Sequence, residues 1–167
     1  MSEKPLQNTP ANTEDPRIND LRGAFEHRAL WFGLLIDEAR KRGLDETFAR
    51  EAILRCGRFH AHAKYPCTDS IPEFAEAFAN DNVVNIFEME VKHVDEEEMR
   101  IDFHYCPLVA AWEKLGFSRD DIALYCDIAM DGDRGIIEEL PAFSFHLGKT
   151  IAKGDAVCEI LVSKKQK

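Results

Sequence analysis

The stretch Phe143–Val162, FSFHLGKTIAKGDAVCEILV, decides how the C-terminal part of this 167-residue chain is interpreted. Two strand-like runs flank residues 152–154 (AKG), which have the pattern of a three-residue hairpin loop with its glycine in the left-handed conformation. This loop length sets the pairing of the strands, so that His146, Thr150 and Cys158 lie on one face of a β-hairpin. We therefore expect a thiol, an imidazole and a hydroxyl to lie together.

The opposite face of this hairpin is apolar: Phe143, Phe145, Leu147, Ile151, Val157 and Leu161. A two-residue loop would instead place His146 and Cys158 on opposite faces, because side chains alternate along a strand. A packed cysteine and a surface histidine without a functional role is the alternative interpretation.

The composition bounds the class of protein. A length of 167 residues with 45% hydrophobic residues suggests one domain with a substantial core, which we place at residues 17–167. The formal charge of −10 argues against nucleic-acid and anionic-membrane partners, which need basic surfaces. With no long apolar run and a polar N-terminus, we expect a cytoplasmic protein.

The cysteines fit neither a disulfide framework nor a zinc ribbon, because their number is odd and no CxxC pair occurs. They are Cys56, Cys67, Cys106, Cys126 and Cys158, and we expect free thiols. Cys56, His60 and His62 are spaced as possible metal ligands, but they lack a recognisable full ligand set, so we predict no metal cofactor while keeping a soft-metal site open.

Apolar spacing of three and four residues predicts helices in the N-terminal half. Residues 1–16 are polar and are expected to form a flexible tail. Helices over residues 17–42 and 45–64 should form an antiparallel hairpin, and Ser70 can cap a short helix over residues 71–79.

Alternation then predicts strands over residues 83–93 and 99–105, joined by the acidic turn 95–98. Their apolar side chains share one face, and His104 lies on the polar face. We therefore expect an α+β fold: an N-terminal helical hairpin and a mostly antiparallel four-stranded sheet, with helices covering one face and two helices between the second and third strands.

Cys106 is the candidate nucleophile. Pro107 suits the first turn of a helix, which makes Cys106 the expected N-cap, where the partial positive charge of the helix favours thiolate. The alternative is a thiol sealed beneath the sheet, whose pKa would be raised. A further helix should begin at Ser118 and carry Cys126, and residues 129–141 are expected to form a turn rather than a calcium loop.

The order YCP, helix, LYCDIAMD, FHLGKTIAKGDAVCEI resembles the L-2-amino-thiazoline-4-carboxylic acid hydrolase family. The similarity rests on Cys106 with Pro107, on Cys126 with Asp127, and on the block that contains Thr150, Asp155 and Cys158. It covers residues 82–162, and it implies a small α+β protein that opens a cyclic amidine-like ring to give a carbamoyl amino acid.

We derive a mechanism for this implied reaction from the residues. Cys106 attacks the amidine carbon, His146 or His104 moves protons, and Asp127 or Asp155 binds the amidinium. In this scheme Cys126, Thr150 and Cys158 contribute to substrate binding. Asp155 also has a purely structural interpretation, as the residue that follows the turn glycine.

Two other classes of function remain open. The thiols and imidazoles can belong to a non-catalytic module that binds a small molecule or a metal, and the chain faintly resembles 4-vinyl reductase-like domains in its Cys-bearing hairpin. In a purely structural alternative, the polar face of the sheet is solvated or packs against a second subunit, which would make the protein a homo-oligomer.

Overall fold

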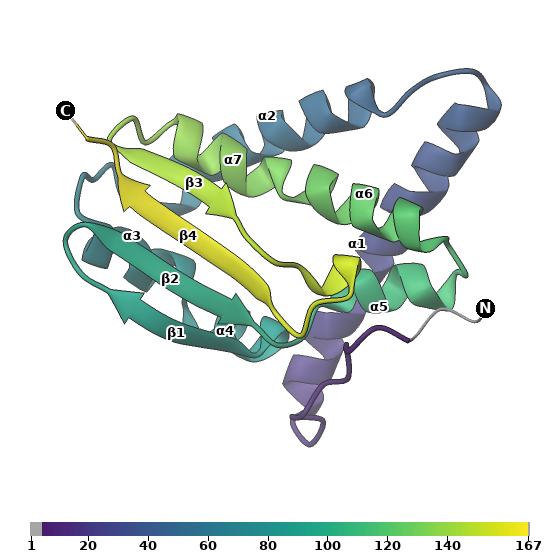
Figure 1. Cartoon of the computed structure of the whole chain (residues 1–167), viewed down its shortest axis with the longest axis horizontal. Helices are drawn as coiled ribbons and strands as arrows, with labels where there is room; N and C mark the ends of the chain where they lie inside the picture. Colours follow the sequence, from purple (N-terminus) through teal and green to yellow (C-terminus); the bar gives the residue numbers. More distant parts are fainter. Residues whose placement is uncertain (1–4, 167) are drawn as a thin grey trace.

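The computed structural model describes residues 5–166 and has the predicted α+β architecture. The strands form one four-stranded sheet, and Figure 1 shows helices packed behind it and beside it. In chain order the elements are α1 (Pro16–Lys41), α2 (Thr47–Lys64), α3 (Ile71–Phe78), α4 (Asp81–Phe87), β1 (Met89–Val94), β2 (Glu98–Phe103), α5 (Pro107–Lys114), α6 (Arg119–Ala129), α7 (Asp131–Glu138), β3 (Phe143–Leu147), the 3-10 turn η1 (Ile151–Lys153) and β4 (Cys158–Lys164).

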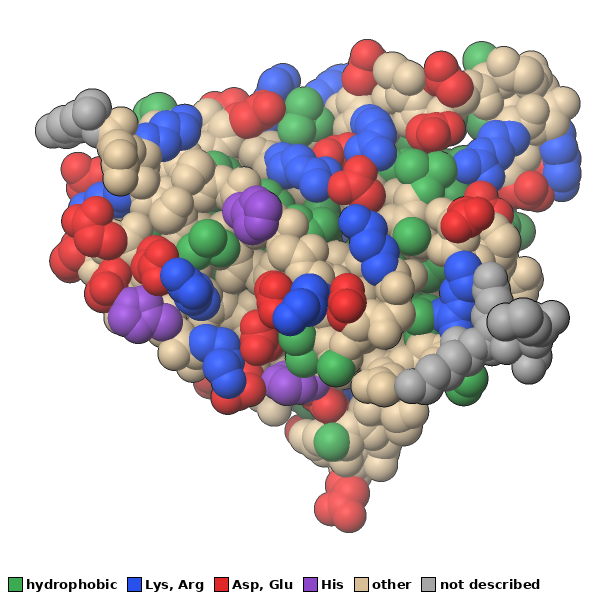
Figure 2. All heavy atoms as spheres, viewed as in Figure 1, with side chains coloured by type: hydrophobic (Ala, Val, Ile, Leu, Met, Phe, Trp, Pro, Cys, Tyr) green, Lys and Arg blue, Asp and Glu red, His purple; other side chains and the backbone are tan. Residues whose placement is uncertain are grey.

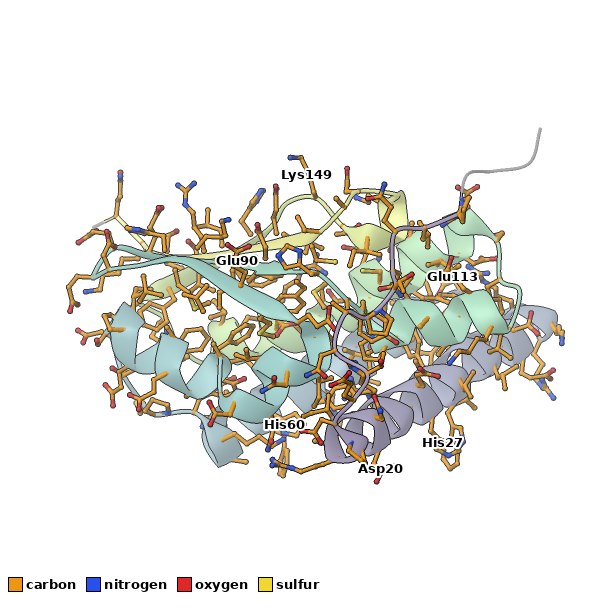
Figure 3. The ribbon with its side chains drawn as sticks, turned by 90° about the horizontal axis from the view of Figure 1, so that it is seen from below. Asp20, His27, His60, Glu90, Glu113 and Lys149 are labelled. Atoms are coloured by element: carbon orange, nitrogen blue, oxygen red, sulfur yellow. The ribbon has the colours of Figure 1, made fainter. Side chains whose placement is uncertain are left out.

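The sheet has the order β1-β2-β4-β3, and every neighbouring pair is antiparallel. Figure 3 shows the sheet from its edge, with Glu90 and Lys149 on the open face and His60 and His27 on the helical side. Acidic and basic side chains are mixed over the open face in Figure 2. The expected arrangement of the sheet, with one face covered by helices, is therefore confirmed.

The predicted three-residue loop is wrong. Strands β3 and β4 pair with Leu147 opposite Ile160, which differs by one residue from the expected register. Residues 148–157 connect the strands through η1, and only Gly154, with φ 95°, adopts its predicted left-handed conformation. A shift of one residue turns every side chain to the other face, so His146 is exposed while Cys158 is buried.

Two predictions of local structure also fail. The alternating residues after Asp81 form helix α4 before β1 starts, because the Asn80 side chain accepts a hydrogen bond from the Val83 amide and caps a helix. Residues 131–138, predicted as a turn, form α7. A short alternating run does not by itself separate a strand from a helix of two turns.

The described part of the N-terminal segment runs along the surface before α1 begins. The side chain of Asn8 bonds both backbone groups of Cys106, accepting from its N–H at 2.8 Å and donating to its carbonyl at 2.9 Å. Glu88 accepts from the amides of Ala11 and Asn12 and pairs with buried Arg22. The segment therefore has defined partners on the folded domain; residues 1–4 of the predicted flexible tail lie outside the described residues.

The two long helices diverge, and each packs on a partner from later in the chain. Helix α1 lies against α5, where the Trp112 indole N–H donates to the Ala29 carbonyl at 2.9 Å. Helix α2 lies against α7, where Gly57 and Gly135 bring the two backbones close together. Helices α1 and α2 diverge (Figure 1), and residues of both line a pocket together with residues of α5, α6, α7 and the sheet. Among the described residues, no helix is long and apolar enough to cross a membrane.

Candidate functional site

A largely apolar cavity of about 320 Å³ lies in the space between α1, α2 and the covered face of the sheet. This volume is at the lower end of the range for sites that bind drug-sized molecules. Its lining residues come from elements spread along most of the chain and include Phe25, Arg28, Phe32, Cys56, His60, Lys64, Phe103, Cys106, Trp112, Cys126, Asp133, Leu147, Cys158 and Ile160. We call this space the cavity.

Three buried cysteines contribute to the wall of the cavity. Cys106 comes from the start of α5, Cys126 from α6 and Cys158 from the start of β4. They are close enough for the charge state of one to affect the pKa of another. The structure thus brings together the three thiols that the sequence singled out, although they form no disulfide.

Cys106 occupies the N-cap position predicted from Pro107. Burial raises the pKa of its thiol, while the amides of Val109 and Leu108 and the guanidinium of Arg28 lower it by less. The sulfur makes no full capping hydrogen bond. Cys106 is therefore a neutral thiol in a field that favours the thiolate, and a cation bound nearby would strengthen that field.

Cys126 and Cys158 are the other two buried thiols in the cavity wall, and the pKa of each is raised. Burial raises the pKa of Cys158 to about 12, although its sulfur accepts a hydrogen bond from the Ile151 amide at 3.3 Å. Burial raises the pKa of Cys126 well above its usual value, and the neighbouring thiols add to the effect. Both are suited to shaping the cavity rather than to attacking a substrate.

Arg28 and Asp133 place opposite charges in the cavity. The guanidinium of Arg28 lies 4.6 Å from the ring centre of Phe25, and partial burial lowers its pKa although the residue also reaches solvent. Asp133 lies in the first turn of α7, and burial raises the pKa of its carboxyl to about 6, against the attraction of Arg28 and Arg134. No ion pair joins Arg28 to Asp133 among the described residues, so both groups are available to a ligand.

Replacing Asp133 with asparagine should stabilise the protein in a pH-dependent manner. Below about pH 4 the carboxyl is protonated in both the folded and unfolded states, so asparagine brings no gain. Above a folded pKa of about 6 the wild-type carboxylate is ionised in both states, and its burial opposes folding. We expect a gain in the free energy of unfolding of about 2 kcal/mol at pH 8.

Urea unfolding at pH 4 and pH 8 measures this difference. Asp131→Asn is the matched control, because Asp131 pairs with Arg50 at 3.0 Å and with Arg134 at 2.6 Å, and its replacement should destabilise the protein at pH 8. An equal effect of Asp133→Asn at the two pH values would show that its carboxyl is not the titrating group.

The structure does not bring His146 or His104 to the cavity. His146 projects from the open face of the sheet as a result of the register shift, and His104 on that face lies 3.1 Å from Glu90. Asp127 is engaged by Arg50 and Arg134 at 2.7 and 2.8 Å, away from the cavity lining. The proton-transfer and amidinium-binding roles expected for these residues therefore do not fit their positions.

Thr150 and Asp155 close the loop before β4. The Thr150 amide donates to the Asp155 carboxylate at 3.1 Å, and the Asp155 amide donates back to the Thr150 carbonyl at 3.2 Å. This agrees with the structural interpretation of Asp155. The Thr150 hydroxyl is buried without a partner among the described residues, and it does not line the cavity.

Sequence reasoning missed Arg28 and Asp133. Arg28 lies beside the apolar stripe of α1, three residues after Phe25, where a charged residue is normally assigned to the solvent. Asp133 lies in the run MDGD, whose acidic residues and glycine indicate a turn rather than a buried carboxyl. The described residues contain no group of three or more His, Cys, Asp or Glu side chains placed to hold a metal ion.

Residues 22–162 match the family described as L-2-amino-thiazoline-4-carboxylic acid hydrolase. This match covers most of the chain, including every cysteine. The chain belongs to this family. No curated protein matches the sequence.

One similar solved structure is a trafficking protein particle complex subunit 3 from Naegleria fowleri covalently bound to palmitic acid. It has 21% sequence identity and a TM-score of 0.43, over 92% of this chain and 84% of that chain. Similarity at this level says nothing about what the present family member binds.

Proposed function

We propose that this family member is a hydrolase that opens a cyclic amidine-like ring of the amino-thiazoline-carboxylate type in the cavity. The observation that carries the proposal is the position of Cys106, at a helix N-terminus and in the wall of the cavity. The description of the family supplies the substrate class.

The proposed reaction begins with the thiolate of Cys106. It adds to the amidine carbon, the ring bond between that carbon and the ring sulfur breaks, and the released ring sulfur takes a proton and becomes a thiol. Water then adds to the same carbon, displaces the Cys106 sulfur and leaves a carbamoyl product. Asp133 takes the amidinium-binding role, because its carboxyl lies in the same cavity.

Substrate binding itself helps to ionise Cys106 in this scheme. The free thiol is held neutral by burial. An amidinium within about 4–6 Å of the sulfur favours the charged thiolate. The Cys106 thiol would thus be unreactive in the free protein and reactive in the complex with substrate. This difference protects a buried cysteine from unselective chemistry.

Turnover of 2-amino-thiazoline-4-carboxylate tests the proposal. Purified protein is incubated with the compound, and carbamoyl-cysteine is quantified by liquid chromatography and mass spectrometry. We expect product that increases with enzyme concentration. Saturable binding of the compound without product would reject the hydrolase.

A non-catalytic binding module is the second candidate. It is favoured by the raised pKa of Cys106, Cys126 and Cys158 and by the absence of His146 and His104 from the described cavity wall. Binding without product in the assay above is the result that this candidate expects.

A further inference from the structure

The mouth of the cavity has unpaired positive charge. Arg28 and Lys64 are exposed residues that also line the cavity, so they mark the place where it meets solvent. Within the described residues neither side chain forms a hydrogen bond or an ion pair, and the Arg28 guanidinium lies over the face of Phe25. This is notable in a chain with 31 acidic and 21 basic residues, where an acidic partner is easily found.

His60 adds a hydrogen-bonding group at the same place. It lies on α2, one turn before Lys64, on the helical side of the molecule in Figure 3. Its Nδ1 atom is buried and has no partner among the described residues. Buried polar atoms are normally satisfied, so an unpartnered ring nitrogen beside two cations without ion-pair partners favours an anionic ligand at this place.

The interior of the cavity has a different character. Phe103, Leu147 and Ile160 from the sheet face Phe32 and Trp112 from the helices, together with the three thiols. Away from Asp133 this part of the wall offers few hydrogen-bonding groups, so a polar group placed against it would lose its hydration without compensation. The interior therefore selects an apolar group, which gains about 25 cal/mol per Å² of surface removed from water.

From these two features we propose that the cavity binds a monocarboxylate with an apolar body. The carboxylate lies at Arg28 and Lys64, within reach of His60, and the apolar body extends towards Leu147 and Ile160. Asp133 is the one acidic residue of the described lining, so the two cations exceed it in charge. The inference rests on the proposed function only in taking the cavity as the substrate site; it does not require that Cys106 reacts.

Titration calorimetry with simple probes tests the inference. Decanoate should bind with a stoichiometry of one, decanol should bind about 10- to 100-fold more weakly because it lacks the charge-assisted hydrogen bonds, and acetate should show no binding at the same concentrations. Equal affinity for decanoate and decanol would overturn the carboxylate site. Binding of several decanoate molecules per chain would overturn the single cavity.

Variants locate the carboxylate. Arg28→Ala should reduce decanoate affinity to that of decanol, and Lys64→Ala should cause a smaller loss. Arg55→Ala is the matched control, because Arg55 is exposed on α2 and does not line the cavity. Retained decanol binding by Arg28→Ala shows that its cavity is intact. Unchanged decanoate affinity in Arg28→Ala would overturn the assignment.

Separate measurements of binding and turnover distinguish this inference from the proposed function. If the cavity is a carboxylate site, the wild type binds decanoate whether or not it turns over an amidine ring. If the wild type turns over the amidine ring but does not bind decanoate, the apolar-carboxylate inference alone is rejected.

Discussion

Alanine at Gly135 is expected to lower the free energy of unfolding by about 3 kcal/mol or more, or to prevent folding. A Cβ atom built at this position lies 2.3 Å from the backbone carbonyl oxygen of Leu54 and 3.1 Å from the Cα atom of Gly57. These are backbone atoms of α2, which cannot rotate away as the end of a side chain does. The methyl group therefore has to push α2 and α7 apart.

Gly23→Ala is the control for this prediction. Gly23 lies inside helix α1 and has no atom within 4 Å of a built Cβ, so alanine should stabilise the helix by up to about 1 kcal/mol. Urea unfolding of the two variants measures the contrast. If Gly135→Ala unfolds at the wild-type urea concentration, the close crossing of α2 and α7 is not present in solution.

Alanine at Cys106 is expected to reduce turnover of the cyclic amidine by about 10³-fold or more, because a lost nucleophile is not replaced by its neighbours. Cys126 and Cys158 line the same cavity, but burial raises the pKa of both. The stability cost should be modest, because Cys106 makes no full capping hydrogen bond and alanine fits the space.

Cys67→Ala controls for the removal of a thiol. Cys67 is exposed and does not line the cavity, so its replacement should leave kcat and KM unchanged. Unfolding curves confirm that each variant is folded at the assay temperature. Turnover in Cys106→Ala within a few-fold of the wild type would remove Cys106 from the reaction.

The sequence was sufficient where a local signal decides the structure. Pro107 predicts the start of α5, and Ser118 predicts the start of α6, where its hydroxyl accepts from the Asp121 amide at 3.1 Å. The family resemblance found at Cys106, Cys126 and Cys158 is confirmed, and these thiols do share one cavity. Caps and strand alternation are properties of a few neighbouring residues, which a sequence displays directly.

The sequence was insufficient where packing between distant segments of the chain decides the structure. Ile151 and Ala152 in η1 are buried, so the connection before β4 packs against the core. This longer connection replaces the tight loop that would have placed His146 beside Cys158. Arg28 comes from α1 and Asp133 from α7, which lie far apart in the chain. Only the divergence of α1 and α2, fixed by their packing on α5 and α7, makes the two residues line one space.

The central claim is that the Cys106 sulfur reacts with a ligand inside the cavity. Acid quenching during turnover of 2-amino-thiazoline-4-carboxylate, followed by peptide mapping in the mass spectrometer, tests it most directly. We predict a substrate-derived adduct on the peptide that contains Cys106, absent from Cys106→Ala. An adduct confined to Cys67, which is exposed and does not line the cavity, or product formation by Cys106→Ala at the wild-type rate, would contradict the claim.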